Sequence, residues 1–583
     1  MPEKPNVIFI LTDDQGYGDT GFGGNTIIDT PNLDKLHSES VCFTDYHTGP
    51  TCAPTRASLL TGRYHNATGV WHTIGGRSLL RRDEVTLAEA FKGSGYTTGI
   101  FGKWHLGDSY PYRPQDRGFD AAVVHGGGGI GQTPDYWGND YFDDTYFDKG
   151  SPRGFRGYCT DVFFDLGAKF IEDNRETPFF CYIPTNAPHI PLQVDESYVE
   201  PYKNKAPENR ARFYGMISCI DKNIGFLRVK LQQLGLAEKT IFIFMTDNGT
   251  DNGCVLDENN YVIDGYNMGM RGKKSSPYEG GHRTPFLLHW PDGGISQHTD
   301  IDILAASIDF MPTLADLCGL KYDTERFHGK SLVPLMRGET VDWMDRIIVT
   351  DSQRVATPAK WRESCCMQGK WRLINGCELY NLTFDAGQRK NIVAEYADIA
   401  EHLRLGYENW WETVSKRFDE DIPLYIGSEA EGAIILTSHD IRGSDNDVAW
   451  NQKQIRLGRI CDSYWEVFAG NTGWYDFELR RWPAEEPRAI TGGIEGEIND
   501  WWSGGTALPI ISASLKIGDN TLTKQVLPGQ CNVKFEVWLD KGPYHLYASF
   551  TDREGIGRTA YYVYVVFRHI GSLSGDNLDS GKE

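Results

Sequence analysis

The sequence of 583 residues lacks any apolar run that approaches the ~18–20 residues needed to cross a membrane as a helix. It also lacks a basic excess, since 58 Lys and Arg stand against 80 Asp and Glu, for a net charge of −22. Nucleic-acid phosphates need a basic surface, so this charge disfavours a non-specific nucleic-acid binder. It does not exclude a small anionic substrate, because a local cluster of cations can invert the field within one pocket. We therefore predict neither a membrane segment nor a nucleic-acid partner.

The N-terminus shows no signal-peptide pattern, because residues 1–5 lead directly into the first apolar run. We therefore expect a cytoplasmic protein or, if a leader has been removed, a periplasmic or secreted one. The 12 cysteines are scattered without the spacing of small disulfide-rich domains, which predicts mostly reduced thiols. No nucleotide-binding pattern surrounds the glycine run at residues 126–129, so we interpret that run as a flexible pocket loop.

Short and almost wholly apolar runs predict strands that are buried on both faces, as in a mainly parallel sheet. These runs are residues 6–11, 98–101, 178–183, 240–245 and 285–288. Helical patterns alternate with them at residues 87–94, 161–174, 210–234 and 301–318. This alternation predicts an α/β sandwich that occupies residues 1–359.

The pattern changes near residue 360. Residues 369–374 and 377–382 are predicted to be short antiparallel strands, followed by a helix over about 394–416, in a small subdomain of residues 360–421. Beyond about residue 422 we expect the helices to stop, and regular short strands between turn signals predict an accessory β-sandwich over residues 422–570. The polar residues 571–583 are predicted to form a flexible tail.

Polar residues follow two of the predicted strands at the point where each ends. Asp13 and Asp14 come after the first strand, and Asp247 and Asn248 come after the fourth. Ligands of open α/β sheets gather at the carboxyl ends of the strands, so both pairs are expected at one edge. Because they offer only oxygen atoms, they predict a site for a hard cation, Ca²⁺ or Mg²⁺.

Cationic residues and one unusual cysteine occur in short motifs between these strand ends. Cys52 lies in a Cys-x-Pro-x-Arg pentapeptide that ends at Arg56, and a Thr-Gly pair follows at residues 61–62. Lys103 and His105 lie in Gly-Lys-Trp-His-Leu-Gly, and His189 is flanked by prolines. A further lysine pair, Lys273 and Lys274, precedes a Glu-Gly-Gly turn. Lysines and protonatable histidines of this kind are suited to stabilising charge on an anionic substrate.

In their order along the chain, these motifs resemble those of the type I, formylglycine-dependent sulfatases, whose fold is similar to that of alkaline phosphatase. The resemblance covers about residues 5–410 and implies that a maturation enzyme oxidises Cys52 to formylglycine. It also implies that Asp13, Asp14, Asp247, Asn248 and the oxidised Cys52 hold one divalent ion, typically Ca²⁺, with Mg²⁺ as the other option. Thr55 stands where the commonest form of the signature has Ser; we expect maturation to survive this change.

The resemblance further implies a role for each catalytic residue. Arg56 would hold the formylglycine hydrate, and one hydroxyl of the hydrate, assisted by the metal and Asp247, would attack sulfur in line. His189 and Lys274 would protonate or stabilise the departing alcohol, because the family's lysine lies five residues before the glutamate and this selects Lys274 over Lys273. His105, steadied by Lys103, would then remove a proton from the second hydroxyl and expel sulfate.

The chain is most similar to the bacterial carbohydrate sulfatases, which implies a sulfated saccharide, and we expect an O-sulfated galactose or N-acetylgalactosamine unit. Several polar or aromatic residues near the motifs suit a sugar subsite: Trp71, His72, Arg77, His125, Tyr136, Trp137, Arg271, His282 and Arg283. Three alternatives are a formylglycine-dependent phosphonate or phosphodiester hydrolase, a phosphatase of the same fold with two metals, and a sugar-binding protein without activity. The intact catalytic motifs argue against the last.

Overall fold

The computed structural model describes residues 4–341, 343, 345–443 and 448–568. Within these residues the chain divides into two compact units, one with residues 4–108 and 112–420 and the other with residues 109–111 and 421–568. The residues predicted to form the flexible tail, 571–583, lie outside the described part of the chain. Among the described residues, no helix is both long enough and apolar enough to cross a membrane.

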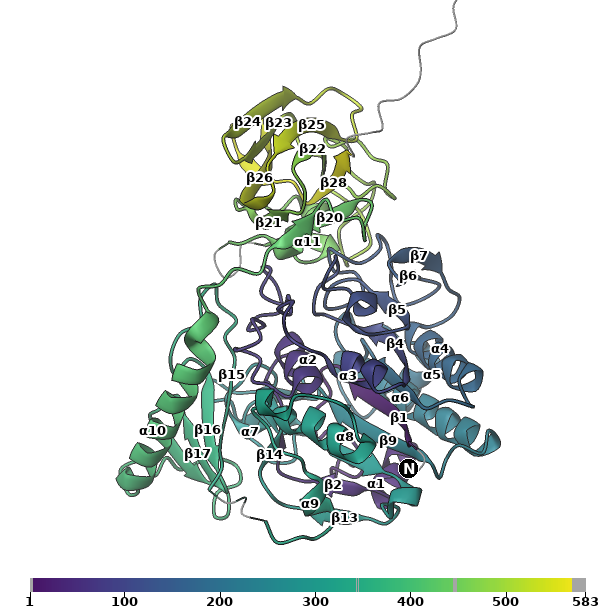
Figure 1. Ribbon diagram of the computed structural model, residues 1–583, viewed down its shortest axis with the longest axis vertical. Coiled ribbons are helices and arrows are strands. Elements are labelled where there is room, and N and C mark those ends of the chain that lie inside the picture. Colours follow the sequence, from purple (N-terminus) through teal and green to yellow (C-terminus); the bar gives the residue numbers. More distant parts are fainter. Residues whose placement is uncertain (1–3, 342, 344, 444–447, 569–583) are drawn as a thin grey trace, which may run out of the picture. The chain divides into compact units, whose positions relative to one another are not determined.

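The first unit is built on a ten-stranded sheet with the order β13-β2-β12-β9-β1-β8-β4-β5-β6-β7 (Figure 1). Parallel pairing joins β13 to β2, β9 to β1, β1 to β8, β8 to β4 and β4 to β5. In contrast, β12 runs antiparallel to β9 and β2, and β6 runs antiparallel to β5 and β7. The predicted mainly parallel sheet is therefore confirmed. The strands are β1 (Asn6–Thr12), β2 (Val41–Phe43), β4 (Thr97–Lys103), β5 (Ala121–His125), β6 (Thr145–Asp148), β7 (Ser151–Gly154), β8 (Phe179–Pro184), β9 (Thr240–Thr246), β12 (Phe286–His289) and β13 (Thr299–Ile301).

Helices cover both faces of this sheet, as the apolar strands require. On β1, Val7 and Phe9 belong to one apolar cluster and Ile8 and Ile10 to another, because successive side chains of a strand point to opposite faces. The first cluster includes residues of α2 (Cys52–Thr61), α3 (Leu87–Gly93) and α8 (Phe310–Cys318), and the second includes residues of α1 (Pro31–Ser38), α4 (Cys159–Asp173) and α6 (Glu208–Gln233). The short helices α5 (Glu196–Val199), α7 (Glu279–His282) and α9 (Val333–Met336) complete the set, with 3₁₀ turns at Pro114–Arg117, Glu200–Tyr202, Pro291–Gly293, Ser307–Asp309 and Thr324–Arg326.

The helix predicted over residues 301–318 is wrong in its first half. The segment begins with the last residue of β13, continues through β14 (Ala305–Ala306), which pairs with β3 (Tyr46–His47), and becomes α-helical only at Phe310. The Asp309 carboxylate accepts a hydrogen bond from the Ala306 amide at 2.9 Å and thereby fixes the tight turn that precedes the helix. The apolar residues before Phe310 thus belong to buried extended chain, which periodicity alone does not distinguish from a helix.

A four-stranded antiparallel sheet also belongs to the first unit. Its order is β15 (Ile347–Asp351), β16 (Ser364–Gln368), β17 (Trp371–Ile374) and β18 (Glu378–Asn381), and α10 (Ala397–Val414) packs against it. A small hairpin pairs β10 (Cys254–Leu256) with β11 (Val262–Gly265), and a 3₁₀ turn at Ser415–Arg417 follows α10. The strand β15 lies before residue 360, so this sheet draws on both sides of the predicted boundary.

The second unit contains two mainly antiparallel sheets, with one parallel pair between β19 and β21, and strands such as β22 and β25 alternate buried with more exposed residues, as in a sandwich. One sheet holds β19 (Leu424–Ile426), β21 (Trp465–Ala469), β26 (Gly542–Asp552), β23 (Ile510–Ile517), β24 (Asn520–Gln525) and β27 (Gly557–Thr559). The other holds β20 (Ile434–Thr437), β28 (Tyr562–Arg568), β22 (Gly473–Arg480) and β25 (Val533–Leu539). The expectation of no helix after residue 422 is wrong, because α11 spans Gln452–Leu457 and a 3₁₀ turn lies at Ser438–Asp440. The Asn451 side chain caps the start of α11, and Gly458 follows its end. A single helix of six residues is too short for its pattern to stand out.

Candidate active site

The ends of β1 and β9 bring three carboxylates together. The two strands are parallel neighbours in register, with Thr12 opposite Thr246, so Asp13, Asp14 and Asp247 leave the sheet at the same edge. Each offers an oxygen atom within 4.8 Å of the others, and all three are buried. The Asp14 amide donates to Asp247 Oδ1 at 3.2 Å, and Asn248 Nδ2 donates to Asp14 Oδ1 at 3.0 Å. We call these four residues the oxygen cluster.

The donor set of the oxygen cluster fits a hard divalent cation. Two of its buried oxygens, Oδ1 of Asp13 and Oδ1 of Asn248, have no hydrogen-bond partner among the described residues. Burial, and then the nearby Asp13, raise the pKa of Asp247 to about 7. Unpartnered buried oxygens and crowded carboxylates are what Ca²⁺ or Mg²⁺ would satisfy, because both ions prefer oxygen ligands.

Cys52 is the first residue of α2 and is only 3% exposed. Thr51 leads into the helix in an extended conformation, Pro54 occupies the first turn, where its missing N–H is tolerated, and Gly62 ends the helix in the left-handed conformation. Burial raises the pKa of the Cys52 thiol, against the opposing charge of Lys103, so the thiol itself would be a weak nucleophile. The Ser275 amide donates to Pro50 O at 2.8 Å and ties the lysine loop to the loop before Cys52.

Arg56 lies one helical turn after Cys52 and therefore on the same face of α2. Its side chain is fully buried. Nη2 donates to Asp247 Oδ2 at 2.8 Å, and Nη1 donates to Lys103 O at 3.1 Å. The guanidinium thus connects α2 to the residues at the ends of β9 and β4.

The lysine loop brings Lys274, and not Lys273, to the oxygen cluster. Lys274 Nζ donates to Asp14 Oδ2 at 2.6 Å, and His189 Nε2 lies 3.8 Å from the same oxygen. Lys273 Nζ instead donates to Asp251 O at 2.8 Å. Burial opposes the charge of Lys274, but Asp14 raises its pKa, so the ammonium stays protonated. Burial and the charge of Lys274 lower the pKa of His189 to about 4.

Lys103 and His105 have separate partners. Lys103 Nζ donates to Asp13 Oδ2 at 2.5 Å, whereas His105 Nε2 faces Thr73 O at 2.9 Å. The Thr73 carbonyl is thus one group that orients the His105 ring, and the steadying of His105 by Lys103 stays a prediction. His105 lies beyond the end of β4 with a φ of 62°, in the left-handed region of the backbone.

The glycine run at residues 126–129 packs directly against the two histidines. A Cβ at Gly128 would lie 2.3 Å from Cε1 of His105, and one at Gly126 would lie 2.2 Å from Pro134 O. At Gly129, the nearest atom of His189 would be 3.6 Å away. The run is thus a closely packed turn, and the lack of side chains at Gly126 and Gly128 is a steric requirement.

The structure gives several predicted sugar-binding residues internal partners. His282 is completely buried, and its ring nitrogens lie 2.8 Å from His47 Nδ1 and 3.0 Å from Pro277 O. His125 is also fully buried, with Nδ1 3.0 Å from Gly126 O, and Arg283 Nε donates to Thr44 O at 2.7 Å. The Arg271 guanidinium lies over the Tyr278 ring at 3.7 Å, and Trp71 Nε1 donates to Val355 O at 3.2 Å. His282 and His125 are therefore enclosed by protein groups, and the sugar-binding role of all five residues stays a prediction.

Another predicted residue, His72, is adjacent to the residue whose carbonyl faces His105. His72 Nδ1 accepts from the Thr73 amide at 2.6 Å, and the carbonyl of the same Thr73 faces His105. Arg77 Nε donates to Ala356 O at 2.5 Å, and Tyr136 and Trp137 are half-buried in the segment after the glycine run. We retain His72, Arg77 and Trp137 as candidates for a sugar subsite.

Sequence reasoning missed a buried network behind the lysine loop. Glu279, the glutamate of the Glu-Gly-Gly turn, accepts from Arg372 Nε at 2.7 Å, and Arg372 Nη2 donates to Asp45 Oδ1 at 2.7 Å. Asp45 Oδ1 lies 2.8 Å from His47 Nε2, which joins His282 to the same network. The only sequence signal was the motif glutamate of α7, because Arg372 follows 93 residues later, on β17 of the four-stranded sheet.

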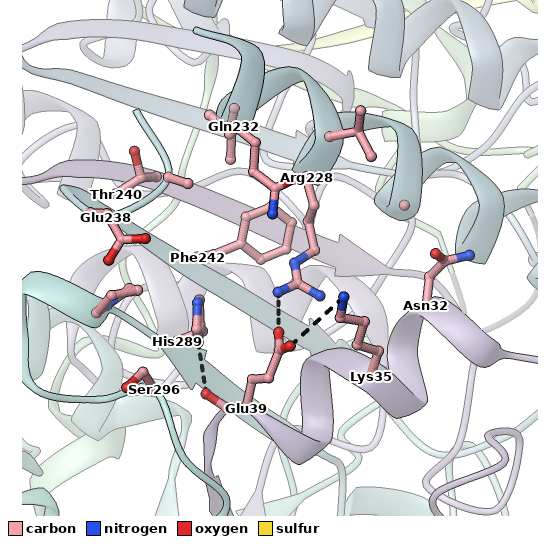
Figure 2. A pocket seen from close by; sticks show the side chains of 15 residues that line it. Asn32, Lys35, Glu39, Arg228, Gln232, Glu238, Thr240, Phe242, His289 and Ser296 are labelled. Atoms are coloured by element: carbon pink, nitrogen blue, oxygen red, sulfur yellow. Dashed lines mark hydrogen bonds and ion pairs between the residues drawn. The ribbon is translucent and has the colours of Figure 1, made fainter. Parts of the chain in front are cut away.

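A separate pocket lies at the other end of β9, between α1 and α6 (Figure 2). Three of its charged groups are paired with one another, because Glu39 accepts from Arg228 and lies 3.9 Å from Lys35 Nζ. His289 Nδ1 also lies 2.7 Å from Glu39 O. None of the predicted site residues lines it. The pocket is thus distinct from the oxygen cluster, which follows the carboxyl end of β9.

Comparison with known proteins identifies similar families, relatives and structures. Residues 5–320 match the family described as Sulfatase, and residues 272–409 match the one described as N-sulphoglucosamine sulphohydrolase, C-terminal. Arylsulfatase J of Mus musculus is 33% identical over 303 residues, which are 49% of this chain and about half (48%) of that protein. N-acetylgalactosamine-6-sulfatase of Mus musculus is 30% identical over 369 residues, which are 58% of this chain and 68% of that protein. The crystal structure of Ps i-CgsB in complex with k-i-k-neocarrahexaose has a TM-score of 0.61 at 24% identity, covers 72% of this chain and 99% of that one, and supports the fold.

Proposed function

The chain belongs to the sulfatase family and is a sulfuric ester hydrolase, and on this premise we propose that it removes sulfate from O-sulfated saccharides. We further propose that it uses a formylglycine derived from Cys52 and one divalent cation, typically Ca²⁺. The observation that carries the proposal is the position of Cys52. It begins the buried helix α2, on the same face as Arg56, whose guanidinium donates to Asp247 of the oxygen cluster at 2.8 Å.

Formylglycine and the cation would each supply one element of the chemistry. Formylglycine supplies a hydrated aldehyde as the nucleophile, and a cation supplies charge that polarises a sulfuryl oxygen. Asp13, Asp14, Asp247 and Asn248 would hold the cation, since their oxygens converge and two of them lack protein partners among the described residues. Arg56 would orient the side chain at position 52 from the same face of α2.

Proton handling follows from the partners of the two histidines. His189 Nδ1 faces Ile190 O at 2.6 Å and must carry a proton there, so Nε2 is the atom that gains or loses a proton near the departing alcohol. His105 has the opposite arrangement, because Nε2 donates to Thr73 O and leaves Nδ1 as the basic nitrogen. Lys274 remains charged beside Asp14 and is suited to stabilising the negative charge that builds on the bridging oxygen.

The substrate class rests on the relatives and on the candidate subsite. One relative is named an N-acetylgalactosamine-6-sulfatase. This name supports an N-acetylgalactosamine unit with an O-linked sulfate as the substrate, and galactose stays the other option. His72, Arg77 and Trp137 combine hydrogen-bonding groups with one aromatic face, as saccharide recognition needs.

Maturation would have to occur before this helix is packed. Cys52 is 3% exposed, and every residue of α2 from Cys52 to Thr61 is buried. A maturation enzyme would therefore need the unfolded or partly folded chain as its substrate. This makes the fraction of converted Cys52 a property of the expression host, which has to be measured in every preparation.

The test combines mass spectrometry of the peptide across Cys52 with assays of sulfate release. The wild type should contain formylglycine and release sulfate from an aryl sulfate and from sulfated galactose oligosaccharides. Cys52→Ala should fall to the uncatalysed background, whereas Cys181→Ala, which changes a buried cysteine in the middle of β8, should retain activity. Undiminished sulfate release by Cys52→Ala would refute the proposal, and faster turnover of an aryl phosphodiester than of the sulfate would reassign the reaction.

A further inference from the structure

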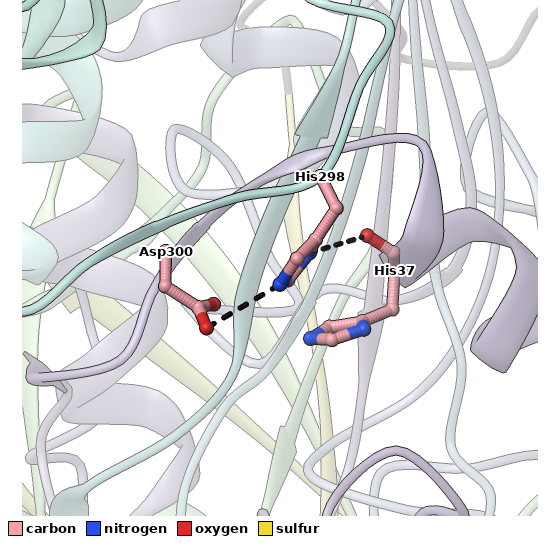
Figure 3. Close-up of side chains that lie close together, drawn as sticks. All are labelled: His37, His298 and Asp300. Atoms are coloured by element: carbon pink, nitrogen blue, oxygen red, sulfur yellow. Dashed lines mark hydrogen bonds and ion pairs between the residues drawn. The ribbon is translucent and has the colours of Figure 1, made fainter.

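A second cluster of metal-ligating side chains lies at the edge of the large sheet, and it consists of His37, His298 and Asp300 (Figure 3). Each residue offers one ligand atom within 4.8 Å of the others. We propose that these three residues form a site for a divalent transition metal, with Zn²⁺ as the ion that fits best. We call them the edge cluster.

The edge cluster is separate from the oxygen cluster. Asp300 lies on β13, which is the edge strand, while the oxygen cluster follows β9 and β1. The strands β2 and β12 lie between β13 and β9, and neighbouring strands are ~4.8 Å apart, so three spacings separate β13 from β9 by about 14 Å. One ion cannot serve both groups.

Backbone contacts hold the three ligands in place although 261 residues separate His37 from His298. His37 lies in the last turn of α1, and the chain then passes through Ser40 into β2. The Thr299 amide donates to Ser40 O at 3.1 Å, and Asp300 is opposite Cys42 in the parallel pairing of β13 with β2. The arrangement is therefore part of the fold and does not depend on mobile side chains alone.

The orientation of His298 is that of a metal ligand. Its Nδ1 faces the carbonyl oxygen of His37 at 3.2 Å and must donate a proton there. Its Nε2 then points at Asp300 Oδ2, 3.3 Å away, and such a contact is favourable with either a proton or a cation between the two atoms. Metal-ligating histidines commonly donate their other ring N–H to a carbonyl, which fixes the tautomer and the orientation of the ring.

The ring of His37 is held beside His298. It stacks on Phe22 with ring centroids 4.6 Å apart and an angle of 8°, and its centroid is 4.4 Å from that of His298. His37 is half-buried, whereas His298 and Asp300 are exposed. The His37 side of the site is therefore fixed by packing, and the side of His298 and Asp300 is open to solvent, from which an ion can bind.

The choice of metal follows from the ligand atoms. Two imidazole nitrogens and one carboxylate oxygen match Zn²⁺, which accepts such sets in tetrahedral geometry and can keep a water in the fourth position. Hard Ca²⁺ and Mg²⁺ prefer oxygen alone and suit the oxygen cluster instead. A metal here would tie the end of α1 to the edge strand β13 and so stabilise that edge of the sheet.

The test is a calorimetric Zn²⁺ titration of the full chain in excess Ca²⁺, which competes for the oxygen cluster. The wild type should bind one equivalent of Zn²⁺, and His298→Gln, Asp300→Asn and His37→Gln should each weaken that binding by about tenfold or more. His289→Gln is the matched control, because His289 also faces a carbonyl near the end of α1, that of Glu39, but lies outside the cluster. It should bind Zn²⁺ like the wild type.

A second readout separates loss of the site from loss of folding. Zn²⁺ should raise the melting temperature of the wild type and of His289→Gln, and should leave that of Asp300→Asn unchanged, while all three melt alike without Zn²⁺. Equal Zn²⁺ affinity in the wild type and Asp300→Asn would overturn the proposal. So would a loss of binding in His289→Gln as large as that in His298→Gln.

Discussion

The turn that carries Gly128 allows a direct test of the position of His105. In Gly128→Ala the new Cβ would start 2.3 Å from Cε1 and 2.5 Å from Nε2 of His105. Non-bonded carbon atoms prefer 3.5 Å or more, so the ring or the turn must move by about 1.2 Å. A displacement of about 1 Å in a catalytic group can cost roughly 10²-fold in rate, or about 2.7 kcal/mol. We therefore expect kcat to fall about 100-fold.

The assay measures kcat on an aryl sulfate, normalised to the formylglycine content of each preparation, together with thermal unfolding. Gly129→Ala is the matched control, because its Cβ would meet Gln132 Nε2 at 3.3 Å and His189 Nδ1 at 3.6 Å, which small side-chain shifts accommodate. It should change the free energy of unfolding by less than about 0.5 kcal/mol and keep most of its activity. If the turn yields in Gly128→Ala, about 1–3 kcal/mol of stability should be lost instead. Wild-type kcat together with wild-type stability in Gly128→Ala would refute the reasoning.

Three further predictions concern charge. Lys274→Met should lower kcat by about 10²–10³-fold, as expected when a group that stabilises transition-state charge is removed. The kcat of Lys273→Met should stay close to that of the wild type. Equal losses of kcat in the two variants, measured in steady-state assays, would contradict the choice of Lys274 over Lys273. Chelation with EDTA should abolish turnover and lower the melting temperature, and Ca²⁺ should restore both; full activity after exhaustive chelation would exclude a required cation in the oxygen cluster. Burial and then Arg63 lower the pKa of His328 to about 4, so the folded protein holds it neutral while the unfolded chain protonates near 6.5. Neutral His328 therefore contributes up to about 3 kcal/mol to the free energy of unfolding above pH 6.5, and this contribution is lost as the pH falls to about 4. The side chain of His328→Gln can still accept from the Tyr64 amide, so the free energy of unfolding of this variant, measured in urea, should depend less on pH.

The sequence predicted those parts of the fold that rest on continuous apolar runs. Each of the five predicted strands of the large sheet appears, because burial on both faces leaves no other environment for such runs. The direction of β12 was not predictable, since an apolar run does not record whether its neighbours are parallel. The segment before Phe310 was misjudged because two residues of strand and a 3₁₀ turn, both buried, carry the same apolar pattern as a helix.

For the candidate site, sequence reasoning worked where a side chain follows a strand end or lies in a spaced motif. Asp13, Asp247 and Lys274 converge as their positions suggested. Interactions through the backbone left no signal, because the carbonyl of Thr73 that holds His105 would be the same for any residue type. The missing Cβ of Gly128 is visible in the sequence, but the ring that requires its absence is visible only in the structure.

The charge balance of the site explains how a chain with a net charge of −22 can receive an anion. Each carboxylate of the oxygen cluster has one cation: Arg56 for Asp247 at 2.8 Å, Lys103 for Asp13 at 2.5 Å and Lys274 for Asp14 at 2.6 Å. In these one-to-one pairs each cation is offset by a carboxylate, which weakens the attraction of the protein groups for a sulfate ester. A divalent cation would add two positive charges in a buried setting, where Coulomb interactions are screened less than in water. Substrate binding should therefore depend on the cation as strongly as turnover does, and inorganic sulfate should lose its affinity for the chelated protein while the lysines and Arg56 remain in place.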